Sequence, residues 1–176
     1  MLPEPVETLW RDLESVRADV LREVEGLSQA QADWKPGEKE WSVGEIVHHL
    51  TIAEIATGKL TTKLTKEVAA TGFPTDLRTF PPLAMDAARR AEAPPVVWPE
   101  TGKPIAVLVT DMKATRDRSR QSIDKLAALD PRPLVFTHFA LGDLNLAQWW
   151  QLQANHDAIH LRQIRDVKAA AGFPKA

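Results

Sequence analysis

The sequence predicts an all-α protein, an up-and-down four-helix bundle with a long proline-rich crossover between its second and third helices. Three observations predict this fold. Four segments carry apolar residues at the three- and four-residue spacing of an amphipathic helix. Two of them open on a polar residue followed three positions later by glutamate or glutamine, which is typical of a helix start. Convincing alternation of apolar and polar residues, the mark of a half-buried strand, is absent from the sequence.

The first helix is expected over residues 5–25, because Pro5 suits a first turn and Gly26 suits the position just after a helix. Its apolar stripe is Val6, Leu9, Leu13, Val16, Val20 and Val24. The second helix is expected to begin at Ser42, where Glu45 completes a capping box. Its stripe runs through Ile46, His49, Leu50, Ala53, Thr57, Leu60 and Leu64.

The third helix is expected over roughly residues 105–129 and the fourth from Asn145 to about residue 171. The stripe of the fourth helix is Trp149, Leu152, Gln153, His156, His160, Gln163, Ile164 and Val167. Between the second and third helices, residues 71–104 hold about half of the chain's 13 prolines. That density excludes a long helix, so we expect a connection with at most a short helix over residues 83–91.

Composition limits the classes of function. A chain of 176 residues is long enough for one domain with its own core, here residues 1–176. The absence of cysteine excludes disulfides, cysteine metal ligands and cysteine nucleophiles. A net charge of −2 without a basic stripe argues against nucleic-acid binding. We find no signal peptide and no apolar run of bilayer length, so we expect a cytoplasmic protein that does not bind membranes.

Two histidines one helical turn apart carry the strongest functional signal. His156 and His160 lie on one helix face, about 6 Å apart along the axis, where both can reach one metal ion. Both belong to the apolar stripe, so we expect them to face the core, where a neutral imidazole needs a polar partner. A shared cation is one such partner. Hydrogen bonds to backbone carbonyls or to Gln163 are another, and the sequence leaves both open.

The second helix offers a third imidazole. His48 and His49 are adjacent and project about 100° apart. His49 shares the apolar stripe, so it is the expected inward ligand, and His48 is expected at the rim or against a neighbouring helix. His138 precedes the fourth helix and has three open roles: a fourth ligand, a donor behind the ligands, or a brace for its loop. We favour the brace.

At these residues the chain resembles the DinB/YfiT-like superfamily. Residues 41–50, Trp-Ser-Val-Gly-Glu-Ile-Val-His-His-Leu, are similar to the family's second-helix signature. The segment from His138 through Gly142, Trp149, His156, His160 and Ile164 is similar to its closing signature, and Asp33-Trp34-Lys35-Pro36 also fits. The resemblance implies a four-helix bundle, frequent homodimers and a divalent cation, usually zinc or nickel, held by His49, His156 and His160. Known reactions of this family include thiol-dependent S-transfer and mycothiol-dependent isomerisation, so the family alone does not determine a substrate.

From the histidines and the resemblance we expect a metal-dependent enzyme that acts on a small molecule, as a thiol (S-)transferase or a hydrolase. In a transferase the thiol would be a low-molecular-weight cofactor, because the chain has no cysteine. The alternative is a non-catalytic helical bundle that binds a metal or another protein. The two differ in whether the ion keeps an open coordination position.

Five further side chains carry weaker expectations. Gln163 orients a ligand or packs as a buried amide, and Asp157 is expected to be a solvated carboxylate between the two histidines. Trp98, in the long connection, is the candidate for a lid over the substrate. Trp149 and Trp150 cannot both face inward; Trp149 lies on the stripe, so Trp150 is expected to meet a partner subunit.

Overall fold

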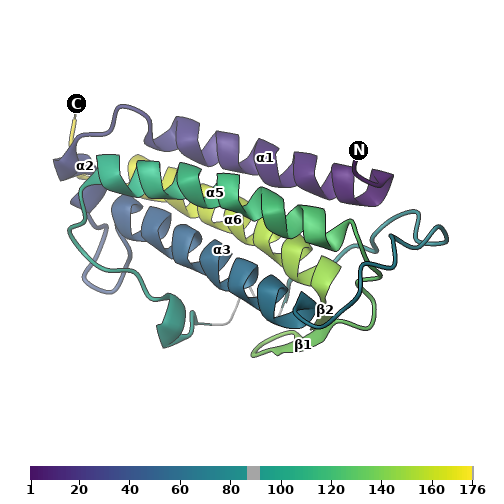
Figure 1. The fold of residues 1–176 in the computed structure, drawn as a ribbon. Coiled ribbons are helices and arrows are strands. Elements are labelled where there is room, and N and C mark those ends of the chain that lie inside the picture. The colour runs from purple at the N-terminus through teal and green to yellow at the C-terminus, as the bar shows by residue number, and fades with distance from the viewer. Residues whose placement is uncertain (87–91, 176) are drawn as a thin grey trace.

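The computed structural model describes residues 1–86 and 92–175 (Figure 1). Its framework is four long helices that lie side by side: α1 (Glu4–Val24), α3 (Val43–Thr65), α5 (Ile105–Leu126) and α6 (Leu146–Ala169). The helical class is therefore confirmed, and each long helix lies within a few residues of its predicted range. Residues 87–91 of the short helix expected over residues 83–91 lie outside the described residues.

The four helices do not alternate strictly in direction (Figure 1). Parallel packing of α1 and α6 follows from two contacts in the same order along both helices, Arg17 with Asp157 and Glu23 with Arg165. By the same test α3 and α5 are parallel, since Glu54 meets Arg116 and Thr62 meets Lys125. The long connection between α3 and α5 carries the chain back to the end of the molecule where α3 begins.

Capping boxes fix where two of the long helices begin. The Ser42 hydroxyl accepts a hydrogen bond from the Glu45 backbone N–H at 3.2 Å, and the Glu45 carboxylate accepts one from the Ser42 N–H at 2.8 Å. Asn145 and Gln148 make the same reciprocal pair before α6. Both boxes were predicted, and both set the register of the helices that carry the histidines.

The core forms two apolar clusters at opposite ends of the four helices. One is built from Val20, Val24, Val43, Ile46, Val47, Leu50, Leu108, Met112, Leu161, Ile164 and Val167. The other is built from Val6, Leu9, Leu13, Ile123, Leu126, Leu129, Leu146, Ala147 and Trp150. The middle of the four helices, between these clusters, holds buried charges that are described below.

Three smaller elements were not predicted: the short helix α2 (Gln29–Asp33), the 3-10 turn η1 (Pro95–Val97), and a hairpin of strands β1 (Val135–His138) and β2 (Gly142–Asn145). The strands pair antiparallel with Val135 opposite Asn145 and His138 opposite Gly142. Gly142 has a φ of +74°, which suits the turn into β2. With only four residues in each strand, the hairpin is too short to give a clear alternation in sequence.

The two adjacent tryptophans of α6 are placed opposite to the prediction. Trp150 is fully buried, and its indole N–H donates to the Thr61 hydroxyl at 3.1 Å. It therefore cannot meet a partner subunit. Trp149 is half-buried and packs against Phe136 of the hairpin. None of the helices in the described ranges combines the length and apolar character that crossing a bilayer demands.

Candidate metal centre

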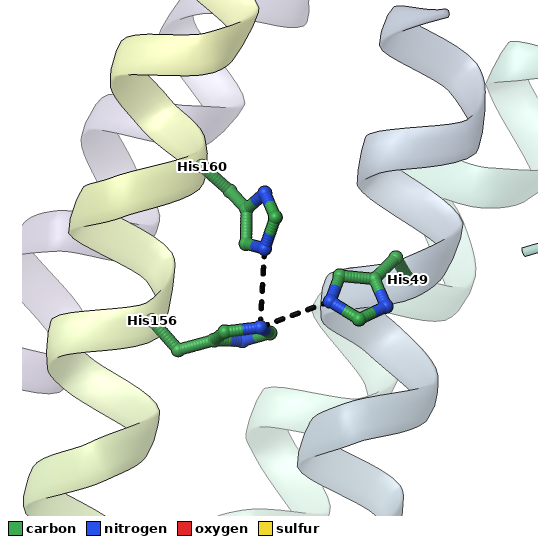
Figure 2. A group of neighbouring side chains, drawn as sticks. All are labelled: His49, His156 and His160. Carbon is green, nitrogen blue, oxygen red and sulfur yellow. Dashed lines mark hydrogen bonds between the residues drawn. The ribbon is translucent and has the colours of Figure 1, made fainter. Parts of the chain in front are cut away.

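Three imidazoles from α3 and α6 converge between the two helices (Figure 2). Nε2 of His156 lies 2.9 Å from Nε2 of His49 and 3.1 Å from Nε2 of His160. Ring nitrogens from all three residues lie within 4.8 Å of one another. Nitrogens bound at about 2 Å around a tetrahedral ion are separated by roughly 3.3 Å. Two of the three nitrogen spacings are therefore already close to those that one shared ion requires, and the third is no longer than 4.8 Å.

The hydrogen-bond partners of the outer ring nitrogens decide which atoms face the centre. His49 Nδ1 lies 2.7 Å from the Val97 carbonyl oxygen, which can only accept, so this nitrogen carries the hydrogen. His160 Nδ1 likewise donates to Gln163 Oε1 at 2.7 Å. In the neutral rings, Nε2 of His49 and Nε2 of His160 therefore both point bare lone pairs at the centre.

This donor set fits a divalent metal. Among three neutral rings arranged in this way, only His156 has a hydrogen to offer at Nε2, and it can donate that hydrogen to one neighbour at a time. The Nε2 lone pair of the remaining histidine then faces another nitrogen and accepts no hydrogen bond, which is unfavourable in a buried site. One cation would accept all three lone pairs, and imidazole nitrogen is a preferred ligand of zinc and nickel.

Burial keeps the three imidazoles in the neutral form that binds metals. Desolvation is the largest cause in each case: it lowers the pKa of His49 to about 4 and that of His156 well below its usual range. The pKa of His160 is also lowered, although the hydrogen bond with Gln163 opposes the effect. Part of this burial comes from Trp41, whose ring centroid lies 4.7 Å from that of His49. The site needs no deprotonation at neutral pH before it can bind an ion.

A cavity of about 1030 Å³ lies against the cluster, and His49, His156 and His160 form part of its wall. Its other walls come from α3, from residues 92–98 of the long connection, from the hairpin and from α6. A cavity of this size holds a drug-sized molecule. A cation on the three Nε2 atoms would therefore border a space that a ligand can enter.

Two adjacent histidines tie the long connection to α3. His49 donates through Nδ1 to Val97, as described above, and His48 Nδ1 accepts a hydrogen bond from the Glu100 backbone N–H at 2.9 Å. The Thr101 hydroxyl donates to the Glu45 carboxylate at 2.7 Å. His48 is thus buried beneath the connection and not at the rim, which was one of its two expected places, and it lies outside the cluster.

The remaining predicted residues surround the cavity. His138 Nδ1 accepts hydrogen bonds from the N–H groups of Ala140 and Leu141, each at 3.2 Å, so it braces the hairpin turn while its ring lines the cavity. Trp98 also lines the cavity; it is 58% exposed and its indole N–H donates to the Ala93 carbonyl at 2.6 Å. Gln163 lies behind His160 as its hydrogen-bond acceptor.

A buried network of four charges lies on the side of α6 away from the cavity, and sequence reasoning missed it. Asp157 Oδ2 accepts from Arg17 at 2.8 and 3.0 Å and from Arg116 at 3.2 Å. Glu54 pairs with both arginines, at 2.7 Å to Arg17 and 2.8 Å to Arg116. Asp157 also accepts from the Gln153 amide at 3.0 Å. The network is neutral overall and links all four long helices.

The expectation that Asp157 is solvated is wrong, because its exposed fraction is 0%. The mistake arose from treating one face of α6 as buried, whereas this helix packs on α3 through one face and on α1 through another. A signal was present in the other helices. Arg17 lies at helical spacing from Leu13 and Val20, and Arg116 lies at helical spacing from Met112, so both arginines fall on apolar stripes. A charge on an apolar stripe predicts a buried partner.

Comparison with known proteins gives two similarities. A family model described as the DinB superfamily matches residues 12–164. The chain is also similar to the uncharacterized protein YuaE of Bacillus subtilis (strain 168), with 24% identity over 156 residues, which cover 86% of this chain and 92% of that protein. No solved structure matches the chain significantly.

Proposed function

Because the chain belongs to the DinB superfamily, whose members are in general metal-dependent, we propose that it is a metal-dependent enzyme acting on a small molecule. His49, His156 and His160 would hold one divalent ion, zinc or nickel. One observation carries the proposal: three Nε2 atoms, two of them fixed as lone-pair donors by Val97 and Gln163, converge at the wall of a cavity.

A divalent ion bound there would act as a Lewis acid that lowers the pKa of a coordinated thiol or water. We propose thiol (S-)transfer, with the thiol supplied by a low-molecular-weight cofactor because the chain has no cysteine, or hydrolysis. The protein's own part is positional. Val97 and Gln163 hold the two outer rings in one tautomer, and the surrounding aromatic and aliphatic side chains give the cavity a mostly apolar wall.

The alternative is a non-catalytic metal-binding or protein-interaction module. A purely structural ion is closed off by four protein ligands. Here the cluster of described residues contains three donors and borders a cavity of about 1030 Å³. That arrangement favours an ion that a substrate can reach.

The proposal includes the finer architecture and the partners. We propose that residues 1–176 form one four-helix-bundle domain whose proline-rich connection is the crossover from α3 to α5, and that the protein forms homodimers. The parallel packing of α3 and α5 supports the crossover, since a short loop joins only antiparallel neighbours. Light scattering of the purified protein would test the dimer.

Metal analysis of untagged protein tests the proposed site. We expect about one divalent ion per chain in the wild type and a loss of most of that ion in His49→Ala. The matched control is His48→Ala, which removes the neighbouring buried imidazole and should keep the ion. Equal retention in both variants, with both folded by circular dichroism, would show that the cluster does not hold a metal.

A further inference from the structure

The polar groups of the described cavity wall are largely committed to partners within the protein. Gln163 Oε1 accepts from His160, and the Gln153 amide donates to Asp157 at 3.0 Å. The Thr57 hydroxyl donates to the Ala53 carbonyl at 3.2 Å. Among the described residues, the Gln163 N–H2 group and the Gln153 carbonyl oxygen have no such partner, so a ligand's hydrogen bonds with these groups would concentrate at the two amides of α6.

His138 adds a further donor to this wall. Because its Nδ1 accepts two backbone N–H groups, the hydrogen of the neutral ring is on Nε2. The cavity wall thus offers one imidazole donor beside the three-histidine cluster. The uncommitted polar atoms of the described wall are therefore few, and the Gln163 amide lies directly beside the three-histidine cluster.

The rest of the described wall is mostly apolar. Its aromatic members are Trp41, Trp98, Phe136, Phe139 and Trp149, and its aliphatic members include Leu60, Met85, Val96, Leu152 and Ile159. Four of these side chains, Val96, Trp98, Phe136 and Phe139, are also exposed to solvent. Exposed apolar groups gathered at one opening mark a surface that an apolar ligand covers.

Three charged residues complete the described wall: Lys39, Glu40 and Glu92. Lys39 and Glu40 are exposed and carry opposite charges, and Glu92 is exposed and negative. They supply no concentrated positive charge for an anionic ligand. The character of the wall therefore comes from its rings and aliphatic groups.

We propose that the ligand of this cavity is a small molecule with an apolar, aromatic or aliphatic body and one polar head group, which lies at the three-histidine cluster. The position of the head group rests on the proposed function, because a metal ion would bind it. The apolar character of the body does not depend on that function. It selects among thiols: an alkyl or aryl thiol fits the described wall, whereas a thiol with several charges does not.

A cobalt-loaded sample tests the inference, because a thiolate bound to Co²⁺ gives a strong near-ultraviolet absorption. The probes are ethanethiol, 1-propanethiol, 1-butanethiol and 1-pentanethiol, with 3-mercaptopropionate and glutathione as charged counterparts. We expect the dissociation constant to fall about fourfold per added methylene, the value for transfer of a methylene out of water. The charged thiols should bind more weakly than 1-butanethiol. An affinity that does not change with chain length, or tighter binding of the charged thiols, would overturn the inference.

A second measurement separates this inference from the metal site. Metal-free protein should bind the neutral dye Nile red in the cavity, with a rise in dye fluorescence. Ala56→Phe, on the α3 wall, should weaken that binding at least fivefold, and Ala18→Phe, on the exposed face of α1, should not. If the protein binds no cobalt but the dye shows this pattern, the metal proposal fails and the apolar site stands. If cobalt binds and neither variant affects the dye, the apolar site fails and the metal proposal stands.

Discussion

Arg17 of α1 holds Asp157 of α6 through two hydrogen bonds to the same carboxylate oxygen, at 2.8 and 3.0 Å. Asp157 directly follows His156, yet the two side chains lie on different sides of α6. His156 faces His49 on α3, and Asp157 faces α1 and α5. The charge network therefore fixes the rotation of α6 about its axis. That rotation determines whether His156 and His160 face α3.

Replacing Asp157 with asparagine should destabilise the protein strongly. The variant leaves Arg17 and Arg116 with one buried carboxylate, that of Glu54, because the Glu14 carboxylate, 3.4 Å from Arg116, is half-exposed. Breaking a buried ion pair by removing one partner costs about 3–5 kcal/mol. We expect a loss of that order in the free energy of unfolding, measured by urea denaturation. Asp166→Asn, at an exposed position of the same helix, is the control and should change the free energy by about 0.5 kcal/mol or less. A similar small loss for Asp157→Asn would contradict a structural role for the network.

Gln163 should control metal affinity without contributing a ligand. Its Oε1 accepts the hydrogen of His160 Nδ1, and removing such a partner lowers metal affinity by about 10- to 100-fold. We expect that loss in Gln163→Ala, measured by competition with a chromogenic chelator. Gln163→Glu keeps an acceptor and should restore most of the affinity. Arg162→Ala, the exposed neighbour, is the control. If the alanine and glutamate variants bind metal equally well, Gln163 does not orient the ligand.

Metal-free protein should lose stability as the pH falls from about 6.5 toward 4. Burial lowers the pKa of His49 to about 4, whereas an unfolded chain protonates this residue near its ordinary pKa of 6.5. Between these values the unfolded state binds more protons, so acid favours unfolding. For this one group the slope is about 1.4 kcal/mol per pH unit. The pKa values of the Glu45 and Glu54 carboxyls are lowered by their hydrogen bonds and ion pairs, so these groups add to the loss of stability only as the pH approaches 4.5 and falls below it.

Urea denaturation of chelator-treated samples at several pH values would measure this slope. The His49→Ala variant should have a shallower dependence on pH, by up to about 1.4 kcal/mol per unit. Parallel curves for the wild type and the variant would mean that His49 is not buried as a neutral ring.

The periodicity of the sequence was sufficient to predict the long helices and the residues that form the histidine cluster. The stripe on α3 selected His49 over His48, and the spacing on α6 brought His156 and His160 together, as the structure places them. These inferences depend only on local geometry, because side chains three or four residues apart share a helix face. The capping pairs at Ser42 and Asn145 are local in the same sense.

Features that depend on contacts between two elements could not be predicted from the apolar stripe of a single helix. The burial of Asp157 requires Arg17 and Arg116, which lie 140 and 41 residues away in sequence. The burial of Trp150 depends on Thr61 of α3, and the fixed tautomer of His49 depends on Val97 of the connection. Such contacts arise from tertiary packing, which a single helical pattern does not contain.

The most direct test of the metal centre is the anomalous scattering of crystals of untagged protein, collected on both sides of the zinc and nickel absorption edges. We expect one anomalous peak between α3 and α6, about 2 Å from Nε2 of His49, His156 and His160. The metal centre would be contradicted if protein supplied with both metals showed no peak at this position. In that case the three rings would be hydrogen-bonded only to one another, to Val97 and to Gln163.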